Sequence, residues 1–249
     1  MSAPKLMLDG VVKIYEGVVV LDHIDLEVAA HDVVCLIGAS GSGKSTLLKC
    51  VDLLVPVDQG RIVLDDEVIT DPDANANEVR SKIGIVFQSF NLFPHMSVID
   101  NITLAPRKAM GIGKEEAVAR GRELLARFGL DDKAMEYPER LSGGQQQRVA
   151  IIRALATAPD LLLLDEITSS LDPVLVGEVL ELVRELSDQG MTMIIATHEM
   201  GFARDVADRV CFLDQGRVIE QGSPEHVFTD PGQPATRAFL SRLTAAGRL

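Results

Sequence analysis

A glycine-rich stretch between two apolar segments is the feature that most constrains how this chain can fold. Residues 38–46 match the pattern Gly-x-x-x-x-Gly-Lys-[Ser/Thr] at every fixed position. Residues 33–37 are a short apolar run, which is typical of a buried strand. After Lys44, leucine and valine recur every three or four residues as far as Leu54, which predicts a helix. Strand, glycine-rich turn and helix therefore follow one another in the order that a phosphate-binding loop needs.

The loop predicts an anion site in which each part has its own task. Glycines let the backbone wrap an anion with its N–H groups turned inward, and the helix N-terminus adds a partial positive charge. We expect Lys44 to reach the β- and γ-phosphates of a nucleotide and the Ser45 hydroxyl to bind Mg²⁺. A loop of small residues that only turns the chain is the alternative, but the matching flanks favour the anion site. The candidate binding residues are Gly38, Ala39, Ser40, Gly41, Ser42, Gly43, Lys44, Ser45 and Thr46.

The charge of the chain limits its partners. The 249 residues include 24 Lys and Arg against 37 Asp and Glu, so the formal net charge is −13. A surface this acidic disfavours nucleic acid as the main partner, and it also disfavours direct adhesion to anionic lipid. Any membrane association should therefore run through another protein. No signal peptide is expected at the N-terminus, and no apolar run approaches the ~20 residues of a membrane helix.

The three cysteines, Cys35, Cys50 and Cys211, are far apart in the sequence and form no Cys-x-x-Cys pair. Neither a disulfide framework nor a zinc site is indicated. We expect reduced thiols, as in a cytosolic protein.

The hydrophobic pattern predicts one α/β domain spanning 1–249 with an antiparallel portion near its N-terminus. Apolar and polar residues alternate over 6–30, as in strands with one wet face, and 61–69 has the pattern of a hairpin around Asp65 and Asp66. Residues 71–77 are polar and are expected to form a loop. Apolar runs predict further strands at 82–87, at 161–166, which ends in two carboxylates, and at 191–196 and 210–213, with a hairpin partner at 217–221.

Helical spacing dominates the middle of the chain. Residues 98–110, 115–128 and 145–156 have it, and no convincing strand lies within 98–158. We therefore expect a helical subdomain at about 92–158, inserted between core strands. Further helices are expected at 172–189, 224–228 and 234–243, the last two within a closing region at about 224–249.

Polar side chains follow several of the predicted core strands. Consecutive strand residues point to opposite faces, so Asp165 and Glu166 should have different roles: Asp165 near Mg²⁺, and Glu166 beside the water that attacks the γ-phosphate. Gln88 could bind Mg²⁺ or hold that water, although one glutamine is a weak indication. His198 should reach the same sheet edge, because parallel strands gather ligands at their carboxyl ends. A lone histidine there is nevertheless more often structural.

Aromatic residues mark two more positions. Tyr15 could stack on a purine, but taken alone it is more simply a half-buried strand tyrosine. Residues 89–96 contain Phe90 and Phe93, close to the expected phosphate site. They form either a docking surface or a plug for the local core, and the sequence favours neither.

A second glycine-rich turn lies at 141–148, in the sequence Leu-Ser-Gly-Gly-Gln-Gln-Gln-Arg. Ser142 can cap the following helix, and Gly143 and Gly144 leave its first amides uncovered, next to Gln145. This predicts a second phosphate-binding helix start. A dimer in which this turn of one chain closes on phosphates held by the other would use both sites.

In these residues the chain resembles the ATP-binding cassette (ABC) ATPases. The Leu-Ser-Gly-Gly-Gln signature at 141–145 stands in order with the aromatic position, the phosphate loop, the Q-loop at Gln88, the Walker B strand at 161–166, the D-loop at 169–172 and the switch at His198. Residues 90–96, 197–203 and 236–243 are more specifically similar to the polar amino acid uptake branch. Three positions depart from the usual pattern: Ala39 and Ile167 stand where Pro is usual, and Ser170 stands where Ala is usual.

The resemblance implies a RecA-like α/β core with an antiparallel β-subdomain and an inserted helical subdomain. It implies ATP and Mg²⁺ as cofactors, and a homodimer that drives integral membrane permease subunits at the cytoplasmic face of the inner or plasma membrane. An extracytoplasmic solute-binding protein would deliver a polar amino acid or related solute. No nucleic acid partner is expected, and residues 90–96 would lie where a membrane subunit docks.

The family pattern also assigns roles. Tyr15 would stack on adenine, Lys44 would neutralise phosphate charge, and Ser45, Gln88 and Asp165 would place Mg²⁺. Glu166 would orient water and accept its proton, and His198 would hold the γ-phosphate. Ser142, Gly143, Gly144 and Gln145 would complete the site of the other chain.

Other functions remain as alternatives. The chain could serve another ABC importer or exporter, or be a non-transport ABC ATPase acting on nucleic acid or ribosomes. The last is disfavoured, because the chain shows no long coiled-coil insertion, second cassette or basic surface. A GTPase is disfavoured because no Asn-Lys-x-Asp sequence occurs.

Overall fold

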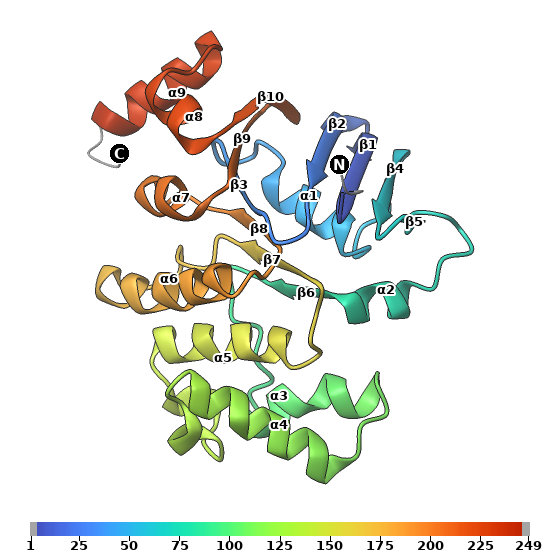
Figure 1. The fold of residues 1–249 in the computed structure, drawn as a ribbon, viewed down its shortest axis with the longest axis vertical. Coiled ribbons are helices and arrows are strands. Elements are labelled where there is room, and N and C mark those ends of the chain that lie inside the picture. Colours follow the sequence, from blue (N-terminus) through green and yellow to red (C-terminus); the bar gives the residue numbers. More distant parts are fainter. Residues whose placement is uncertain (1–3, 246–249) are drawn as a thin grey trace.

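The computed structural model describes residues 4–245, which form two β-sheets with helices around them (Figure 1). One sheet has four strands in the order β2-β1-β4-β5, and the other has six in the order β10-β9-β3-β8-β7-β6. The strands are β1 (Leu6–Tyr15), β2 (Val18–Val28), β3 (Val33–Ile37), β4 (Gln59–Leu64), β5 (Glu67–Val68), β6 (Ile83–Val86), β7 (Leu161–Asp165), β8 (Met193–Ala196), β9 (Arg209–Asp214) and β10 (Arg217–Gly222). The helices are α1 (Lys44–Val51), α2 (Ala76–Lys82), α3 (Val98–Lys108), α4 (Lys114–Arg127), η1 (Asp131–Lys133), η2 (Pro138–Arg140), α5 (Gly143–Leu155), α6 (Pro173–Asp188), α7 (Met200–Val206), α8 (Pro224–Thr229) and α9 (Pro234–Ala245).

The four-stranded sheet is antiparallel, as the alternation of the N-terminal sequence predicts. Leu6 pairs with Val28 and the next inward residues pair likewise, all with buried side chains, whereas Asp9 and Glu27 are exposed. The predicted hairpin is confirmed between β4 and β5. Asp65 and Asp66 both have positive φ there, which matches the right-handed twist of a tight hairpin.

The six-stranded sheet forms the predicted parallel core. Strands β6, β7, β8, β3 and β9 run parallel, and β10 pairs antiparallel with β9. Every residue of β3, β7 and β8 is buried, because both faces of the sheet are covered. Alternate β3 residues enter different cores: Val33 packs in the cluster that holds α5, α6 and α7, and Val34 packs in the cluster that holds α1 and the antiparallel sheet.

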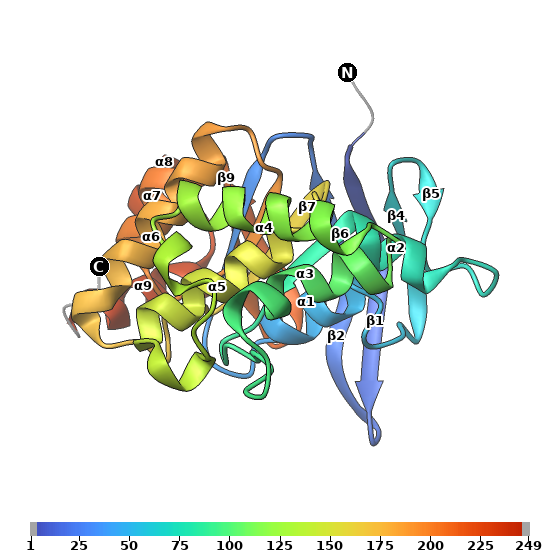
Figure 2. The same ribbon diagram turned by 90° about the horizontal axis from the view of Figure 1, so that it is seen from below.

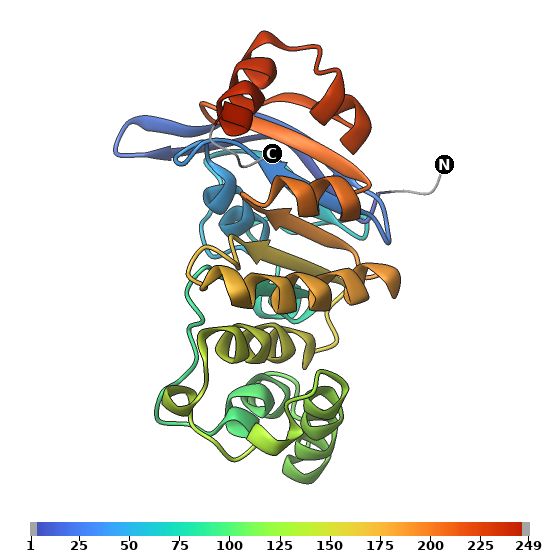
Figure 3. The same ribbon diagram turned by 90° about the vertical axis from the view of Figure 1, so that its left-hand side faces the viewer.

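The helical subdomain lies at the end of the molecule away from α8 and α9, as Figures 1 and 3 show. Helices α3, α4 and α5 agree with the predicted helices to within a few residues, and the structure has no strand within 98–158. Ser97 and Ser142 cap α3 and α5 by accepting hydrogen bonds from backbone N–H groups. Over residues 4–245, no helix combines the length and the apolar character that crossing a membrane requires.

Helices α2 and α1 differ most clearly from the sequence expectation. The polar stretch predicted as loop at 71–77 runs into helix α2, which Asn75 caps by accepting from Asn77 N and Glu78 N. Only Val79 of this short helix is buried, so it carries no apolar period that the sequence could reveal. Helix α1 ends at Val51 rather than near Leu54, because Leu53 has a φ of 53° and ends the helical backbone.

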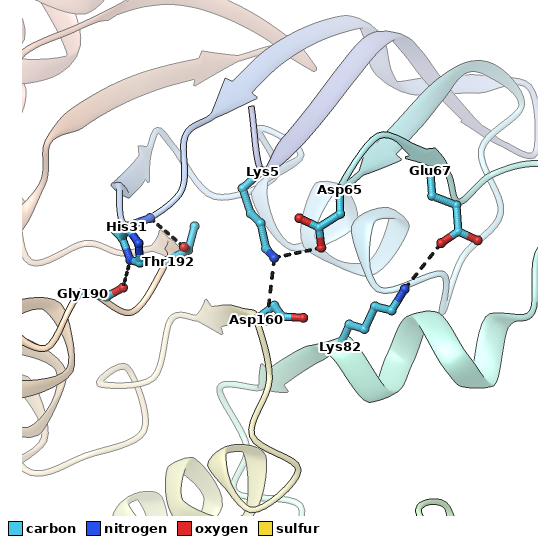
Figure 4. Close-up of polar contacts among 8 residues, drawn as sticks. All are labelled: Lys5, His31, Asp65, Glu67, Lys82, Asp160, Gly190 and Thr192. Carbon is cyan, nitrogen blue, oxygen red and sulfur yellow. Dashed lines mark hydrogen bonds and ion pairs between the residues drawn. The ribbon is translucent and has the colours of Figure 1, made fainter. Parts of the chain in front are cut away.

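Ion pairs join the two sheets at the amino-terminal edge of the parallel strands (Figure 4). Lys5 Nζ lies 2.8 Å from Asp65 Oδ2 and 3.7 Å from Asp160 Oδ1. Lys82 Nζ lies 3.4 Å from Glu67 Oε2. These contacts lie at one edge of the six-stranded sheet, which we call the mixed sheet because β10 is antiparallel to the other strands. The glycine-rich loop lies at the opposite edge.

Candidate functional site

The glycine-rich loop joins β3 to α1 at the carboxyl edge of the parallel strands. A Cβ atom at Gly38 would lie 2.2 Å from the backbone oxygen of Leu213, so only glycine fits there. Gly43 precedes α1 at a φ of 108°, and a Cβ atom on it would lie 2.9 Å from Leu21 Cδ2. Close packing thus fixes the path of the loop over the N-terminus of α1, which is where phosphate binding is favoured.

A cavity of about 250 Å³ opens on this loop. All of its lining residues except one belong to the sequence-predicted site. The lining residues are Val20, Ser40, Gly41, Gly43, Lys44, Ser45, Thr46 and Glu166. Gly38, Ala39 and Ser42 belong to the same loop but do not line the cavity.

Lys44 lies at the centre of the loop and is only 3% exposed. Its Nζ donates to the backbone oxygens of Gly38 at 3.0 Å and Ala39 at 3.3 Å. The same atom lies 3.4 Å from Glu166 Oε1. The ammonium group is therefore directed toward the cavity rather than toward solvent, as a phosphate-binding lysine requires.

Glu166 and His198 meet although they follow different strands. His198 Nε2 lies 2.8 Å from Glu166 Oε1. This hydrogen bond is the main cause that lowers the pKa of Glu166; partial burial opposes it, and the nearby Lys44 charge supports it. The predicted convergence of the phosphate loop, Glu166 and His198 on one sheet edge is confirmed.

Asp165 and Glu166 do not alternate as consecutive strand residues, so the basis predicted for their different roles is wrong. Strand β7 ends at Asp165, and Glu166 has a left-handed φ of 48°, so strand alternation does not apply to this pair. The backbone turn itself directs the two carboxylates apart. Asp165 Oδ1 accepts a hydrogen bond from Ser45 Oγ at 2.7 Å, while Glu166 contacts Lys44.

Ser45 and Asp165 present the kind of oxygen atoms that Mg²⁺ prefers. The pKa of Asp165 is raised above its usual value, mainly by burial and also by the charge of Glu166. The hydrogen bond from Ser45 opposes this rise. Residues 4–245 contain no group of three or more His, Cys, Asp or Glu side chains placed to hold a metal. Ser45, Asp165, water and phosphate oxygens together still suit Mg²⁺, which commonly binds through few protein ligands.

Gln88 and Tyr15 also lie outside the cavity lining. Gln88 is exposed and stands two positions beyond the end of β6, and its backbone oxygen accepts from Ser170 Oγ at 2.9 Å. Tyr15 is 42% exposed near the tip of the β1–β2 hairpin, which projects from the molecule in Figure 2. Lys13 Nζ lies 5.2 Å from the centre of its ring.

The second glycine-rich turn forms the predicted helix start. Ser142 Oγ accepts from Gln145 N at 3.3 Å, and Gln145 Oε1 accepts from Ser142 N at 3.0 Å, so the cap is reciprocal. Ser142 is exposed, whereas Gly144 packs against Leu175, where a Cβ atom would lie 3.2 Å from the Leu175 side chain. None of residues 142–145 lines the cavity of its own chain. In Figures 1 and 3, α5 lies on the side of β6 and β7 away from α1.

Two site residues were not predicted. Val20 on β2 lines the cavity. Gly216, in the turn between β9 and β10, donates its N–H to Ser42 O at 3.1 Å and so supports the loop. Both act through contacts between distant parts of the chain, and no local pattern marks either residue.

The fold and the site define the class of nucleoside triphosphatases that bind phosphate with a glycine-rich loop. The chain adds a pair of carboxylates at the end of β7 and a second glycine-rich helix N-terminus at α5. The ABC transporter family model matches residues 21–169, which is more than half of the chain. The chain belongs to this family and is an ABC ATPase.

Individual relatives agree with this assignment. The chain is 52% identical to the L-cystine transport system ATP-binding protein TcyN of Escherichia coli, covering 94% of this chain and 96% of that protein. It is 48% identical to the glutamine transport ATP-binding protein GlnQ of Geobacillus stearothermophilus, covering 93% and 96%. It is 50% identical to the arginine transport ATP-binding protein ArgV of Corynebacterium glutamicum, covering 96% and 99%.

Solved structures confirm the fold class. The cbiO1 protein of Clostridium perfringens, part of the ABC transporter complex cbiONQ, aligns with a TM-score of 0.82 at 32% identity, covering 99% of this chain and 98% of its own. The bacterial ABC transporter cassette MJ0796, solved as a dimer, aligns with a TM-score of 0.80 at 33% identity, covering 88% and 98%.

Proposed function

We propose that two copies of this chain hydrolyse Mg-ATP to energise import of a polar amino acid or related solute. The observation that carries the proposal is the convergence of Lys44 and His198 on one oxygen of Glu166, beside the cavity of the phosphate loop. The relatives named for cystine, glutamine and arginine transport support the solute class.

In this mechanism the chain binds the triphosphate tail with the amides of 38–46 and with Lys44. Ser45, Asp165 and Gln88 would hold Mg²⁺. The ion, when bound, neutralises charge on the β- and γ-phosphate oxygens. Tyr15 stacks on the adenine that extends from the cavity toward the β1–β2 hairpin.

Glu166 orients the attacking water and accepts its proton. Its lowered pKa keeps the carboxylate ionised at neutral pH, so the group is ready to accept a hydrogen bond from water. His198 exchanges its contact with Glu166 for one with the γ-phosphate when nucleotide enters. This exchange would release the carboxylate for the water only after the phosphate is in place.

The second phosphate-binding turn acts on the partner's nucleotide. Ser142 is exposed and caps α5, and residues 142–145 do not line the cavity of their own chain. A head-to-tail homodimer would bring Ser142, Gly143, Gly144 and Gln145 of one protomer over the phosphates held by its partner. The dimeric form of the related cassette supports this arrangement.

Residues 89–96 divide between the two roles considered for them. Leu92 packs against the core, and the Phe90 ring faces Gly143, whereas Phe93 is 41% exposed. Asn101 holds this loop: its Oδ1 accepts from Phe93 N at 2.7 Å, and its Nδ2 donates to Phe93 O at 3.2 Å and to Met96 O at 3.1 Å. A rigid loop with an exposed aromatic ring suits docking of the integral membrane permease subunits.

The location of the chain and its relation to a solute-binding protein follow from docking on the permease. The chain would lie at the cytoplasmic face of the inner or plasma membrane, attached through the permease. An extracytoplasmic solute-binding protein would load the permease from the other side and would not touch this chain.

Transport in proteoliposomes tests the function. The chain would be assembled with amino acid permease subunits, and ATP-dependent uptake of labelled cystine, glutamine and arginine would be measured with a solute-binding protein for each. Uptake of one of these solutes by the wild type and its loss in the Glu166→Gln variant are expected. Uptake that is equal in the two proteins, or export alone, would contradict the proposal.

A further inference from the structure

The Ser170 side chain makes a hydrogen bond between two separate loops. Its Oγ donates to the backbone oxygen of Gln88 at 2.9 Å, across 82 positions of sequence. An alanine at this position would have no hydroxyl and would leave this carbonyl without the bond. The hydroxyl therefore links the loop after β7 to the segment after β6.

The loop that carries Ser170 is built rigidly onto Glu166. Ser169 N donates to Glu166 O at 3.0 Å, and Leu171 N donates to Thr168 O at 3.0 Å, so two overlapping turns span residues 166–171. Ile167 is 4% exposed and packs in the core of the mixed sheet. The position of the Ser170 hydroxyl is therefore fixed relative to the Glu166 carboxylate.

The segment that receives the bond is also held from a second direction. Arg153 on α5 donates from Nη1 to Asn91 O at 2.6 Å and from Nη2 to Phe90 O at 3.3 Å. The backbone oxygens of Gln88, Phe90 and Asn91 thus each accept a hydrogen bond from a side chain of another element. Of the two donors, only Ser170 connects the segment to the loop of Glu166.

We propose that Ser170 is a positioning residue for ATP hydrolysis. It fixes the backbone of Gln88 relative to Glu166. The Gln88 side chain and the Glu166 carboxylate would then keep a constant relative position around Mg²⁺ and the attacking water. The inference rests on the proposed role of Gln88. Since the link shares no residue with the loop at 38–46, its loss should slow hydrolysis more than it weakens ATP binding.

The Ser170→Ala variant tests this through a split between rate and affinity. Loss of one exposed hydrogen bond should lower the single-turnover rate by about two- to tenfold, with a smaller change in the Kd for Mg-ATP and an unchanged Tm. Ser170→Thr keeps a hydroxyl and should restore the rate. The matched control is Thr244→Val on α9, which removes a hydroxyl that donates to Leu240 O at 3.1 Å, far from the site.

A double-mutant cycle with Gln88→Ala shows whether Ser170 acts through Gln88. With protein in excess over ATP, slow variants stay measurable, and Ser170→Ala should add no further loss in the Gln88→Ala background. A wild-type rate in Ser170→Ala, or the same fold-loss in both backgrounds, would overturn the inference. A Gln88→Ala variant with the wild-type rate would instead show that the proposed role of Gln88 is wrong, and the inference would fall with it.

Discussion

His198 Nε2 lies 2.8 Å from Glu166 Oε1, and Lys44 Nζ lies 3.4 Å from the same oxygen. The three residues follow β8, β7 and β3, which are neighbours in the mixed sheet. One oxygen of Glu166, which follows β7, therefore contacts two side chains that follow the neighbouring strands β8 and β3. A terminal phosphate bound on the loop would enter this group of side chains, so binding and hydrolysis share the same atoms.

The pH dependence of hydrolysis should report the contact between His198 and Glu166. The His198 hydrogen bond is the main cause that lowers the pKa of Glu166, so its removal raises that pKa. Glu166 must be ionised to accept a proton, and the contact exists before nucleotide enters. The acid limb of kcat/KM, which reports the free enzyme, should therefore move to higher pH in His198→Ala. We also expect a loss of about 10²–10³-fold in kcat from the missing donor to the γ-phosphate. Steady-state kinetics across pH measure both, and superimposable profiles of kcat/KM would refute the contact's role.

Tyr15 should contribute to base binding only. The Tyr15→Ala variant should weaken ATP binding by about 1–3 kcal/mol, the usual worth of stacking between a base and an aromatic ring, and Tyr15→Phe should retain it. Calorimetric titration measures the affinities. Inorganic triphosphate carries no base and is the control ligand, so its affinity should be equal in all three proteins. If ATP binds Tyr15→Ala as tightly as the wild type, the stacking assignment is wrong.

Gly216 should matter for stability more than an exposed helical glycine. It has a φ of 77°, and a Cβ atom would lie 2.5 Å from Val20 O, so Gly216→Ala should destabilise by at least about 1–2 kcal/mol. Gly177 on α6 is the control, because a Cβ atom there meets nothing within 4 Å. Gly177→Ala should stabilise by about 0.5–1 kcal/mol. Urea denaturation gives both free energies of unfolding, and equal changes would contradict the packing described for this turn.

Asp52, at the end of α1, should make stability fall as pH rises. The residue is 3% exposed, its Oδ1 has no hydrogen-bond partner, and burial raises its pKa from 3.8 to about 7, against a smaller lowering by Arg80. The unfolded chain ionises this carboxyl first, so folded stability declines as pH rises from about 3.8 through about 7. Asp52→Asn should remove that decline and be the more stable protein at alkaline pH. Thermal unfolding on both sides of neutrality measures this, and parallel curves for the two proteins would exclude it.

Motifs whose chemistry is local could be predicted from the sequence. The turn at 38–46 lies between a buried strand and an amphipathic helix, and the Ser142 cap follows from residue type and spacing. The sequence therefore predicts both. The strand ends that carry Asp165 and His198 were found for the same reason. Parallel strands then bring these ends to one edge without any further information.

Features that depend on distant contacts could not be predicted. Gly216 supports the phosphate loop through one hydrogen bond to Ser42, and the bond from Ser170 to Gln88 crosses between two loops. The left-handed backbone of Glu166 is set by its surroundings, and helix α2 buries too little to show a period. Local residue patterns do not predict such features, because the residues that stabilise each feature lie elsewhere in the chain.

The Glu166→Gln variant isolates the catalytic step from binding. The amide keeps the size of the side chain but cannot accept a proton, so turnover should fall by about 10²–10⁴-fold while ATP stays bound. A variant that hydrolyses ATP at the wild-type rate would show that another group is the base.

Light scattering of Glu166→Gln at saturating Mg-ATP tests the shared site most directly. We expect a dimer with Mg-ATP and a monomer with Mg-ADP. Adding Gly143→Asp should keep the protein monomeric, because a carboxylate would then face the partner's phosphates, while a Cβ atom at this glycine meets nothing closer than 3.5 Å. A monomer of Glu166→Gln with ATP bound, or a dimer that Gly143→Asp leaves intact, would contradict closure of residues 142–145 over a neighbour's nucleotide.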